Sequence, residues 1–178
     1  MPDHVAFLKG MNLGRSRRIT NDELCAAVEA LGFTEVQAFR ASGNVAFDAG
    51  SRPDAALQEA LEAGLREQLG YEVPTFIRSG AELCEIAGRD PFEGSVTGGK
   101  LQVAFLHETA GAAARDEVLA VAEQDDHLAF GERELYWLPA GRMSDSTLDF
   151  KRVERLLGPT TVRTMGTVEQ IVARWFAG

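Results

Sequence analysis

The same order of predicted strands and helices occurs twice along the chain, and this repetition constrains the fold more than any single motif. In the first half, the apolar run at residues 5–8 indicates a buried strand, and a helix follows Thr20. Two strands then flank Gly43-Asn44, a dipeptide that suits a tight hairpin. A second helix and a strand at residues 73–78 complete the order strand, helix, strand, strand, helix, strand. This order is typical of the ferredoxin-like split βαβ motif.

The two helices of the first half have recognisable ends. Thr20 and Glu23 have the spacing of a capping box, and Gly32 is placed to end that helix. Pro53 favours the start of the second helix and Gly70 its end. Leucines recur at every fourth position of this second helix, at Leu57, Leu61, Leu65 and Leu69. We therefore expect one leucine face of this helix to lie in the core.

The second half repeats the order after a short helix that begins near Ser79 and a glycine-rich stretch at residues 90–100. The predicted elements are a strand at 101–107, a helix at 112–122, strands at 127–130 and 134–138, a helix at 147–157, a strand at 160–164 and a terminal helix at 168–176. The tetrapeptide at residues 5–8 recurs unchanged at 103–106. We therefore predict an α+β fold of two ferredoxin-like (βαββαβ) subdomains packed together, with an extra C-terminal helix, and domains at residues 1–90 and 91–178.

Composition limits the classes of function. Of the 178 residues, 45% are hydrophobic and 25% are charged, which is enough to build a core. The formal net charge of -9 repels polyanions, so a nucleic-acid or membrane role would need a local basic patch. The first residues lack a leader pattern and no long uncharged apolar stretch follows, so we predict a cytoplasmic protein. Cys25 and Cys84 form a poor disulfide framework, and we expect both to face the core.

The loop at residues 9–18 is the best candidate for a ligand site. It follows a strand, contains glycines that let backbone approach a ligand, and carries three arginines just before a helix. Guanidinium groups grip phosphate or carboxylate in a bidentate manner, and the amides at a helix start add partial positive charge. The alternative is a solvated loop that binds no ligand and whose arginines offset the negative charge of nearby acidic residues. The predicted ligand-binding residues are Lys9, Gly10, Asn12, Gly14, Arg15, Arg17, Arg18, Ser42 and Asn44.

Other motifs favour structural interpretations. Residues 94–100 have the spacing of a phosphate-binding P-loop as far as Lys100, but Leu101 replaces the Ser or Thr that binds magnesium, and a strand follows instead of a helix. Ser42 lacks the glycine that a nucleophile elbow needs two residues before the serine. The acidic run at residues 123–126 is interpreted as a solvated turn. Ser146 is interpreted as the cap of the helix at 147–157.

Metal and cofactor sites are not predicted. The three histidines share no ligand spacing, and neither cysteine lies near one of them in sequence. No activated nucleophile or acid and base pair emerges, so a reaction class is not assigned. Trp137 and Trp175 lie on apolar faces, and we interpret both as core or interface residues.

Nearly the whole chain resembles the bacterial family catalogued as domain of unknown function 1697. The resemblance rests on residues 9–15 after the first strand, on Ser42-Gly43-Asn44-Val45, and on short signatures such as Pro91-Phe92. Lys9 replaces an arginine that is usual in the family, and Thr147 replaces a common lysine. The resemblance implies two α+β subdomains and supplies no activity, because none is established for the family.

We therefore predict a protein that binds a small anionic ligand, carrying phosphate or carboxylate, at residues 9–18. An RNA or single-stranded DNA binding module is one alternative, because ferredoxin-like sheets serve as recognition platforms in the RRM. The paired exposed aromatics of that module are missing from the first and third strands. A protein-interaction scaffold without a small-molecule site is the other alternative. Catalysis and oligomeric state stay open.

Overall fold

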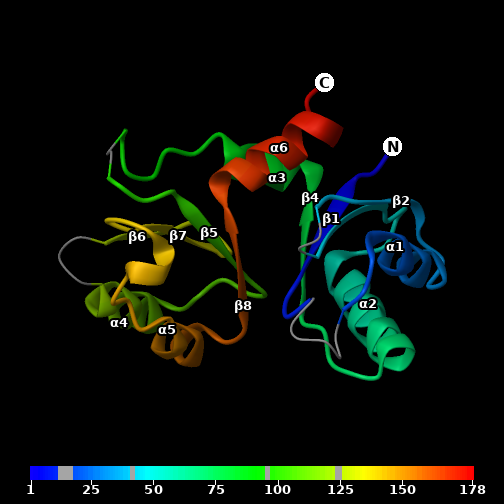
Figure 1. Cartoon of the computed structure of the whole chain (residues 1–178), viewed down its shortest axis with the longest axis horizontal. Helices are drawn as coiled ribbons and strands as arrows, with labels where there is room; N and C mark the ends of the chain where they lie inside the picture. Colours follow the sequence, from blue (N-terminus) through cyan, green and yellow to red (C-terminus); the bar gives the residue numbers. More distant parts are fainter. Residues whose placement is uncertain (12–17, 41–42, 95–96, 123–125) are drawn as a thin grey trace. The chain divides into compact units, whose positions relative to one another are not determined.

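Two four-stranded antiparallel sheets form the framework of the chain (Figure 1). Each sheet carries helices, so the protein is α+β, as predicted. This computed structural model describes residues 1–11, 18–40, 43–94, 97–122 and 126–178. The described chain divides into two units, of which unit 1 comprises residues 1–84 with 171–178, and unit 2 comprises residues 85–170.

Unit 1 contains the first sheet, whose strands lie in the order β2-β3-β1-β4. Its elements are β1 (His4–Leu8), α1 (Asn21–Glu29), β2 (Thr34–Ala38), β3 (Asn44–Asp48), α2 (Asp54–Leu69), β4 (Thr75–Ser79) and the first residues of α3 (Gly80–Ala87). Both α1 and α2 cover the same face of this sheet (Figure 1). The strand order is that of a ferredoxin-like fold.

The core of unit 1 follows from the alternation of side chains along its strands. Ala6 and Leu8 of β1 face the helices and join a cluster with Phe47 of β3. The leucine face of α2 closes this cluster, since Leu57, Leu61 and Leu65 are at most 1% exposed. Burying such side chains stabilises a fold by about 1.5–3 kcal/mol each.

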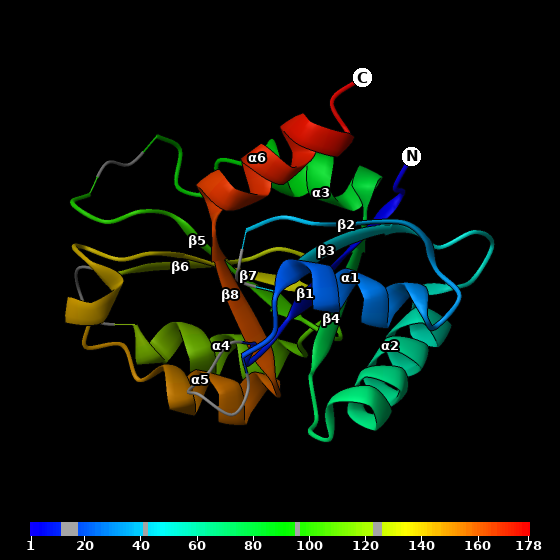
Figure 2. The ribbon, with the colours of Figure 1, turned by 45° about the vertical axis from the view of Figure 1, so that its right-hand side comes forward.

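Unit 2 contains the second sheet, in the order β6-β7-β5-β8. Its elements are β5 (Gln102–Leu106), α4 (Ala112–Val121), β6 (His127–Phe130), β7 (Glu134–Leu138), a short 3-10 helix (Met143–Asp145), α5 (Phe150–Leu157), β8 (Thr160–Thr164) and the start of α6 (Met165–Trp175). Helices α4 and α5 pack side by side, and Figure 2 shows them from a second direction. Ala104, Val118, Leu135 and Val153 form the centre of this core.

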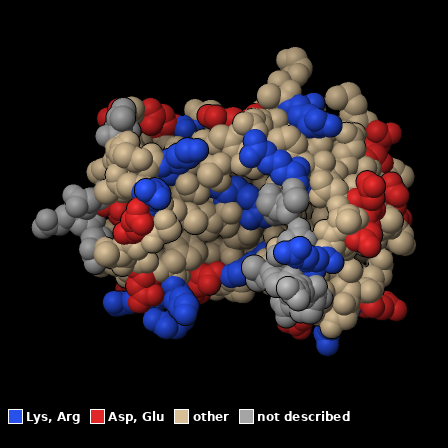
Figure 3. Space-filling view, viewed as in Figure 1, with Lys and Arg blue, Asp and Glu red and all other residues tan. Residues whose placement is uncertain are grey.

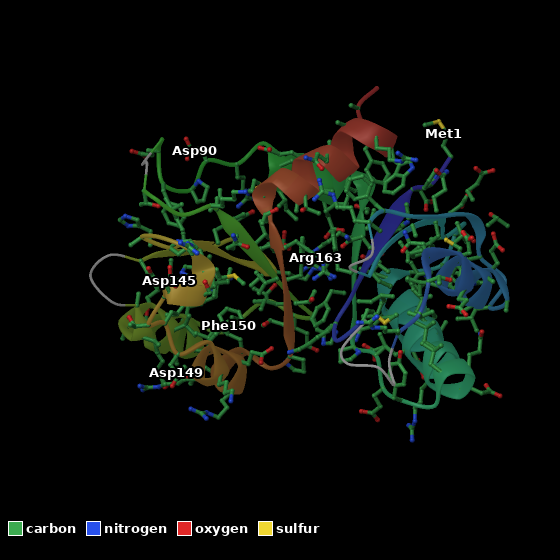
Figure 4. All side chains as sticks on the ribbon, viewed as in Figure 1. Met1, Asp90, Asp145, Asp149, Phe150 and Arg163 are labelled. Atoms are coloured by element: carbon green, nitrogen blue, oxygen red, sulfur yellow. The ribbon has the colours of Figure 1, made fainter. Side chains whose placement is uncertain are left out.

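The two units have equivalent register. Val5 of β1 pairs with Arg78 of β4, and Val103 of β5 pairs with Arg163 of β8. Arg163 is labelled in Figure 4. Because Ile77 belongs to the helix-side core, Arg78 projects to the opposite face of its sheet. Burial lowers the pKa of Arg163 to about 10, which leaves its guanidinium charged at neutral pH.

Equivalent helices of the two halves also accept hydrogen bonds from equivalent strands. Glu62 of α2 accepts a hydrogen bond from the backbone N–H of Thr75 at 3.0 Å. Glu154 of α5 accepts one from the backbone N–H of Thr160 at 3.3 Å. A helix also follows the last strand of both halves, α3 after β4 and α6 after β8, so the extra helix is not peculiar to the C-terminus.

The end of the chain belongs to unit 1. The indole of Trp175 donates from Nε1 to Oε1 of Gln37 at 3.2 Å and packs edge to face against Phe39, with ring centroids 6.0 Å apart. Trp175 is therefore a buried packing residue, as predicted. The two units are groups of residues that pack together, which is a different property from independent folding. The division into domains 1–90 and 91–178 therefore stays a prediction.

Most helix ends agree with the sequence in the first half, although α1 ends at Glu29, before the predicted Gly32, and helix starts differ in the second half. Thr20 and Glu23 form the predicted capping box, and Gly70 ends α2 in the left-handed conformation. The predicted start of α5 at residue 147 is wrong, because Asp149 caps this helix through the N–H of Arg152 (Figure 4). Helix α6 begins three residues before its predicted start, at Met165.

In the described ranges, no helix combines the length and the apolar character that a membrane-spanning helix needs.

Candidate functional site

The carboxyl end of β1 brings three chain segments together. The backbone N–H of Leu8 donates to the carbonyl of Gly43 at 2.8 Å, and the next N–H, that of Lys9, donates to Pro74 at 2.9 Å. Gly10 then turns the chain with a φ of 74°. The start of the 9–18 loop therefore lies beside the hairpin between β2 and β3, which is the proximity that the predicted site requires.

Gly43 is required by this close approach. Its φ of 75° lies in the left-handed region, which side chains rarely adopt. A Cβ added there would lie 3.0 Å from the carbonyl oxygen of Leu8 and 3.0 Å from Cγ of Met11. The hairpin and the loop start are thus fitted together at van der Waals distance.

Asn44 has a structural role in the same hairpin. Its side chain is fully buried, and Nδ2 donates to the carbonyl of Phe39 at 3.0 Å. The backbone N–H of Phe39 donates to the carbonyl of Asn44 at 2.9 Å, so both bonds close the hairpin. A role for Asn44 in orienting a ligand stays a prediction.

The far end of the loop opens onto a cavity of about 480 Å³ in unit 1. Arg18 lies at this point, exposed, immediately before α1. The cavity lies between the first turns of α1 and the last turn of α2. Its lining residues are Arg18, Ile19, Glu23, Ala26, Ala27, Gln68, Leu69 and Tyr71. Pockets that hold small molecules typically have about 300–1,000 Å³, and this cavity, which is largely open to solvent, lies within that range.

The start of α1 is already capped, which changes one part of the prediction. The N–H of Glu23 donates to Oγ1 of Thr20 at 3.1 Å, and the N–H of Thr20 donates to Oε2 of Glu23 at 2.7 Å. The bond from Thr20 lowers the pKa of Glu23, which keeps its carboxylate ionised. These two amides are therefore not open to an anion, and positive charge at this point comes from Arg18.

The predicted site residues divide into two groups. Lys9, Gly10, Arg18 and Asn44 have the positions given above. The other five, Asn12, Gly14, Arg15, Arg17 and Ser42, lie outside the described residues. Convergence of three guanidinium groups on one pocket therefore stays a prediction.

Sequence reasoning missed the contribution of α2 to the cavity. Gln68 donates from Nε2 to the carbonyl of Ala27 at 3.0 Å and so ties the end of α2 to α1. Leu69 is the last member of the leucine series and is only partly buried, unlike the three before it. No local signal in the sequence marks this cavity wall, because the approach of α1 to α2 depends on how both helices cover the sheet.

Asp126 organises a polar cluster in unit 2. Its carboxylate accepts hydrogen bonds from Nε1 of Trp137 at 3.1 Å, the N–H of Ala140 at 3.0 Å and Oγ of Ser146 at 2.6 Å. The interpretation as a solvated turn is therefore wrong for Asp126, and the other residues of the acidic run, 123–125, lie outside the described residues. Ser146 does not cap α5, because Asp149 does; Oγ of Ser146 donates to Asp126 and accepts from the N–H of Leu148 at 3.1 Å.

Replacing Asp126 with asparagine is expected to lower the free energy of unfolding at pH 7 by about 1–3 kcal/mol, because an amide cannot accept all three bonds. Partial burial raises the pKa of Asp126, but the bonds from Ser146, Ala140 and Trp137 outweigh it and hold the pKa below its ordinary value of 3.8. A lowered pKa in the folded state gives stability that is present above the unfolded-state pKa and is lost as the pH falls through the folded-state pKa.

Urea unfolding of wild type and Asp126→Asn at pH 7 and near pH 3 measures this difference. The difference in free energy of unfolding between the two proteins should be smaller at the lower pH, because the stability contributed by the ionised carboxylate is lost as the pH falls below the unfolded-state pKa toward the lowered folded-state pKa. An equal difference in free energy of unfolding at both pH values would contradict the assignment of this stability to the ionised carboxylate.

The remaining motifs have structural positions. Cys84 is exposed and Cys25 is half-buried, so the prediction that both face the core is wrong for Cys84. Burial raises the pKa of the Cys25 thiol.

Thr97 donates from Oγ1 to the carbonyl of Pro139 at 2.7 Å, so the described end of the P-loop-like segment packs on the end of β7. Within the described ranges, no three His, Cys, Asp or Glu side chains are placed to hold a metal ion.

Comparisons with known proteins agree with the fold and identify the family. The structure of the conserved bacterial protein SP0830 from Streptococcus pneumoniae is similar over 98% of both chains, with a TM-score of 0.73 and 18% sequence identity. Identity this low shows a shared fold alone. No curated protein matches the chain. The model of the family described as Protein of unknown function (DUF1697) matches residues 1–136. The chain therefore belongs to this family.

Proposed function

We propose that this protein binds a small anionic ligand, bearing phosphate or carboxylate, where the 9–18 loop joins α1. One observation carries the proposal, namely the cavity of about 480 Å³ that Arg18 lines at the end of this loop. A guanidinium at the rim of such a cavity offers paired N–H donors to an oxyanion. The start of the same loop lies beside the β2–β3 hairpin, and neither segment is among the described residues that line the cavity.

Replacing Arg18 with alanine is expected to weaken binding of the ligand by about 10–100-fold, because hydrogen bonds to charged groups contribute about 1.5–3 kcal/mol. Thermal-shift screening of wild type against inorganic phosphate, phosphorylated metabolites and carboxylates finds the anion, since a ligand that binds only the folded state raises the melting temperature. Arg15→Ala and Arg17→Ala, made separately, are expected to weaken the same binding.

Arg89→Ala is the matched control, since Arg89 is an exposed arginine outside the cavity. This variant should bind as wild type does. Equal weakening by Arg18→Ala and Arg89→Ala would mean that only net charge matters. An absence of shift with every anion would contradict the proposal and leave the scaffold hypothesis ahead.

Nucleic-acid binding receives no comparable support. Phe7 of β1 and Phe47 of β3 are fully buried, whereas an RRM-like platform needs exposed aromatics for base stacking. The scaffold alternative has no observation in its favour among the described residues, and the small-ligand proposal therefore stands first.

Two further parts of the interpretation remain proposals. An internal duplication is supported by the equal strand orders, by the equivalent positions of Arg78 and Arg163, and by the matching hydrogen bonds of Glu62 and Glu154.

A cytoplasmic location is supported by the free thiols of Cys25 and Cys84, which suit a reducing compartment.

A further inference from the structure

The cavity beside Arg18 has an apolar wall. Ile19, Leu69 and Tyr71 line it and also pack against the core of unit 1. Ala26 and Ala27 add a small-residue surface from α1, which leaves room for a ligand group between the two helices. A ligand held by charge alone would leave this apolar surface in water, whereas an apolar group would cover it and gain about 25 cal/mol for each Å².

The charges around the cavity limit the charge of the ligand. Arg18 is the one cation and Glu23 the one carboxylate among its described lining residues. Asp22 and Glu29 of α1 are also exposed, and Figure 3 shows acidic side chains gathered over this helix, at the right of the view. Among the described residues, a di- or triphosphate would gain from one guanidinium and be repelled by these carboxylates. A single negative charge matches the balance of these described charges.

We propose that the ligand is a small carboxylic acid with one negative charge and an apolar body, a proposal that rests on the anion-binding function given above. The planar carboxylate pairs with the guanidinium of Arg18 through two parallel hydrogen bonds. The apolar body lies between Ala26 of α1 and Leu69 of α2. The volume of about 480 Å³ accommodates a phenyl ring with a short chain.

Four probes separate the two features of this ligand. We would measure by calorimetry the binding of 3-phenylpropionate, acetate, inorganic pyrophosphate and 3-phenylpropan-1-ol. The expected result is that 3-phenylpropionate binds about 10–100-fold more tightly than acetate, because only it covers the apolar wall. It should also bind at least about 10-fold more tightly than the uncharged alcohol, which lacks the hydrogen bonds of a carboxylate to Arg18.

Ala26→Phe tests the location of the apolar body. Residue 26 is exposed on α1 and lines the cavity, so a phenyl side chain there can occupy the ligand's space while the core stays intact. Binding of 3-phenylpropionate should fall by about 10-fold or more, the factor that its apolar body contributes. Ala120→Phe, at an exposed position of α4, should leave binding unchanged.

The outcomes distinguish the two levels of the proposal. Pyrophosphate binding that depends on Arg18, together with 3-phenylpropionate no tighter than acetate, would overturn the carboxylic-acid inference and leave the anion-binding function in place. Equal binding of the acid and the alcohol would overturn the inference, because charge would then play no part. Binding by none of the four probes, repeated across the wider anion screen, would contradict both.

Discussion

Replacing Leu61 with alanine is expected to lower the free energy of unfolding by about 2–5 kcal/mol. Leu61 is 1% exposed and lies in the middle of the α2 face that closes the core of unit 1. Truncation removes buried methyl groups and leaves a cavity that the surrounding side chains fill only in part. Urea unfolding followed by circular dichroism measures the loss, and the unfolding midpoint should fall.

Leu119→Ala is the matched control for this prediction. Leu119 also lies in a helix, α4, but its side chain is 42% exposed. The same substitution there should change stability by less than about 0.5 kcal/mol, as is usual for surface positions. Similar losses at the two positions would contradict the assignment of the leucine face of α2 to the core.

Replacing Gly99 with alanine is expected to destabilise unit 2 by about 1–3 kcal/mol. A Cβ at this position would lie 2.2 Å from the carbonyl oxygen of Pro139 and 2.4 Å from that of Gly141. Both atoms belong to the backbone, so no side-chain rotation relieves the clash. The N–H of Gly98 also donates to the carbonyl of Ala140 at 2.9 Å, so the contact between residues 97–99 and residues 139–141 would have to open.

Gly141→Ala tests whether this effect is steric. A Cβ at Gly141 would have no atom within 4 Å, and its φ lies outside the left-handed region. Thermal unfolding should therefore place Gly141→Ala close to wild type and Gly99→Ala several degrees below it. A wild-type melting temperature for Gly99→Ala would show that residues 97–99 do not pack against β7 as described.

Local patterns were enough to predict the fold, because each element carries its own signal. The leucine series of α2, the capping box at Thr20 and Gly70 mark a helix without reference to the rest of the chain. The ferredoxin-like strand order then follows from the order of elements and from the ease of pairing neighbouring strands. Boundaries in the second half were less predictable, since Ser146 and Asp149 are both good caps and only packing decides between them.

Contacts between distant residues were not predictable from local patterns. Asp126 accepts bonds from Trp137, Ala140 and Ser146, which no spacing rule connects. The pairing of Trp175 with Gln37 joins residues 138 positions apart. A charged or aromatic residue shows its type in the sequence, but its partner depends on the tertiary fold.

The candidate site stays a prediction, and Arg18 is the one predicted binding residue among the described residues that line the cavity. Glycines and arginines marked the 9–18 loop, and the structure places the cavity at the end of that loop, beside Arg18. Its other wall comes from the end of α2, at Gln68 and Leu69, and from Tyr71 just after this helix. Sequence could not reveal this wall, because the approach of α1 to α2 depends on how both helices cover the sheet.

An NMR titration with 3-phenylpropionate tests the ligand site most directly. In ¹H–¹⁵N spectra of the full chain, we expect the largest shift changes at the guanidinium of Arg18, the amides of Ala26 and Ala27, and the side-chain amide of Gln68, saturating together with one dissociation constant. Shift changes that cluster in unit 2, or none at Arg18 at saturating ligand, would contradict the assignment of this cavity as the binding site.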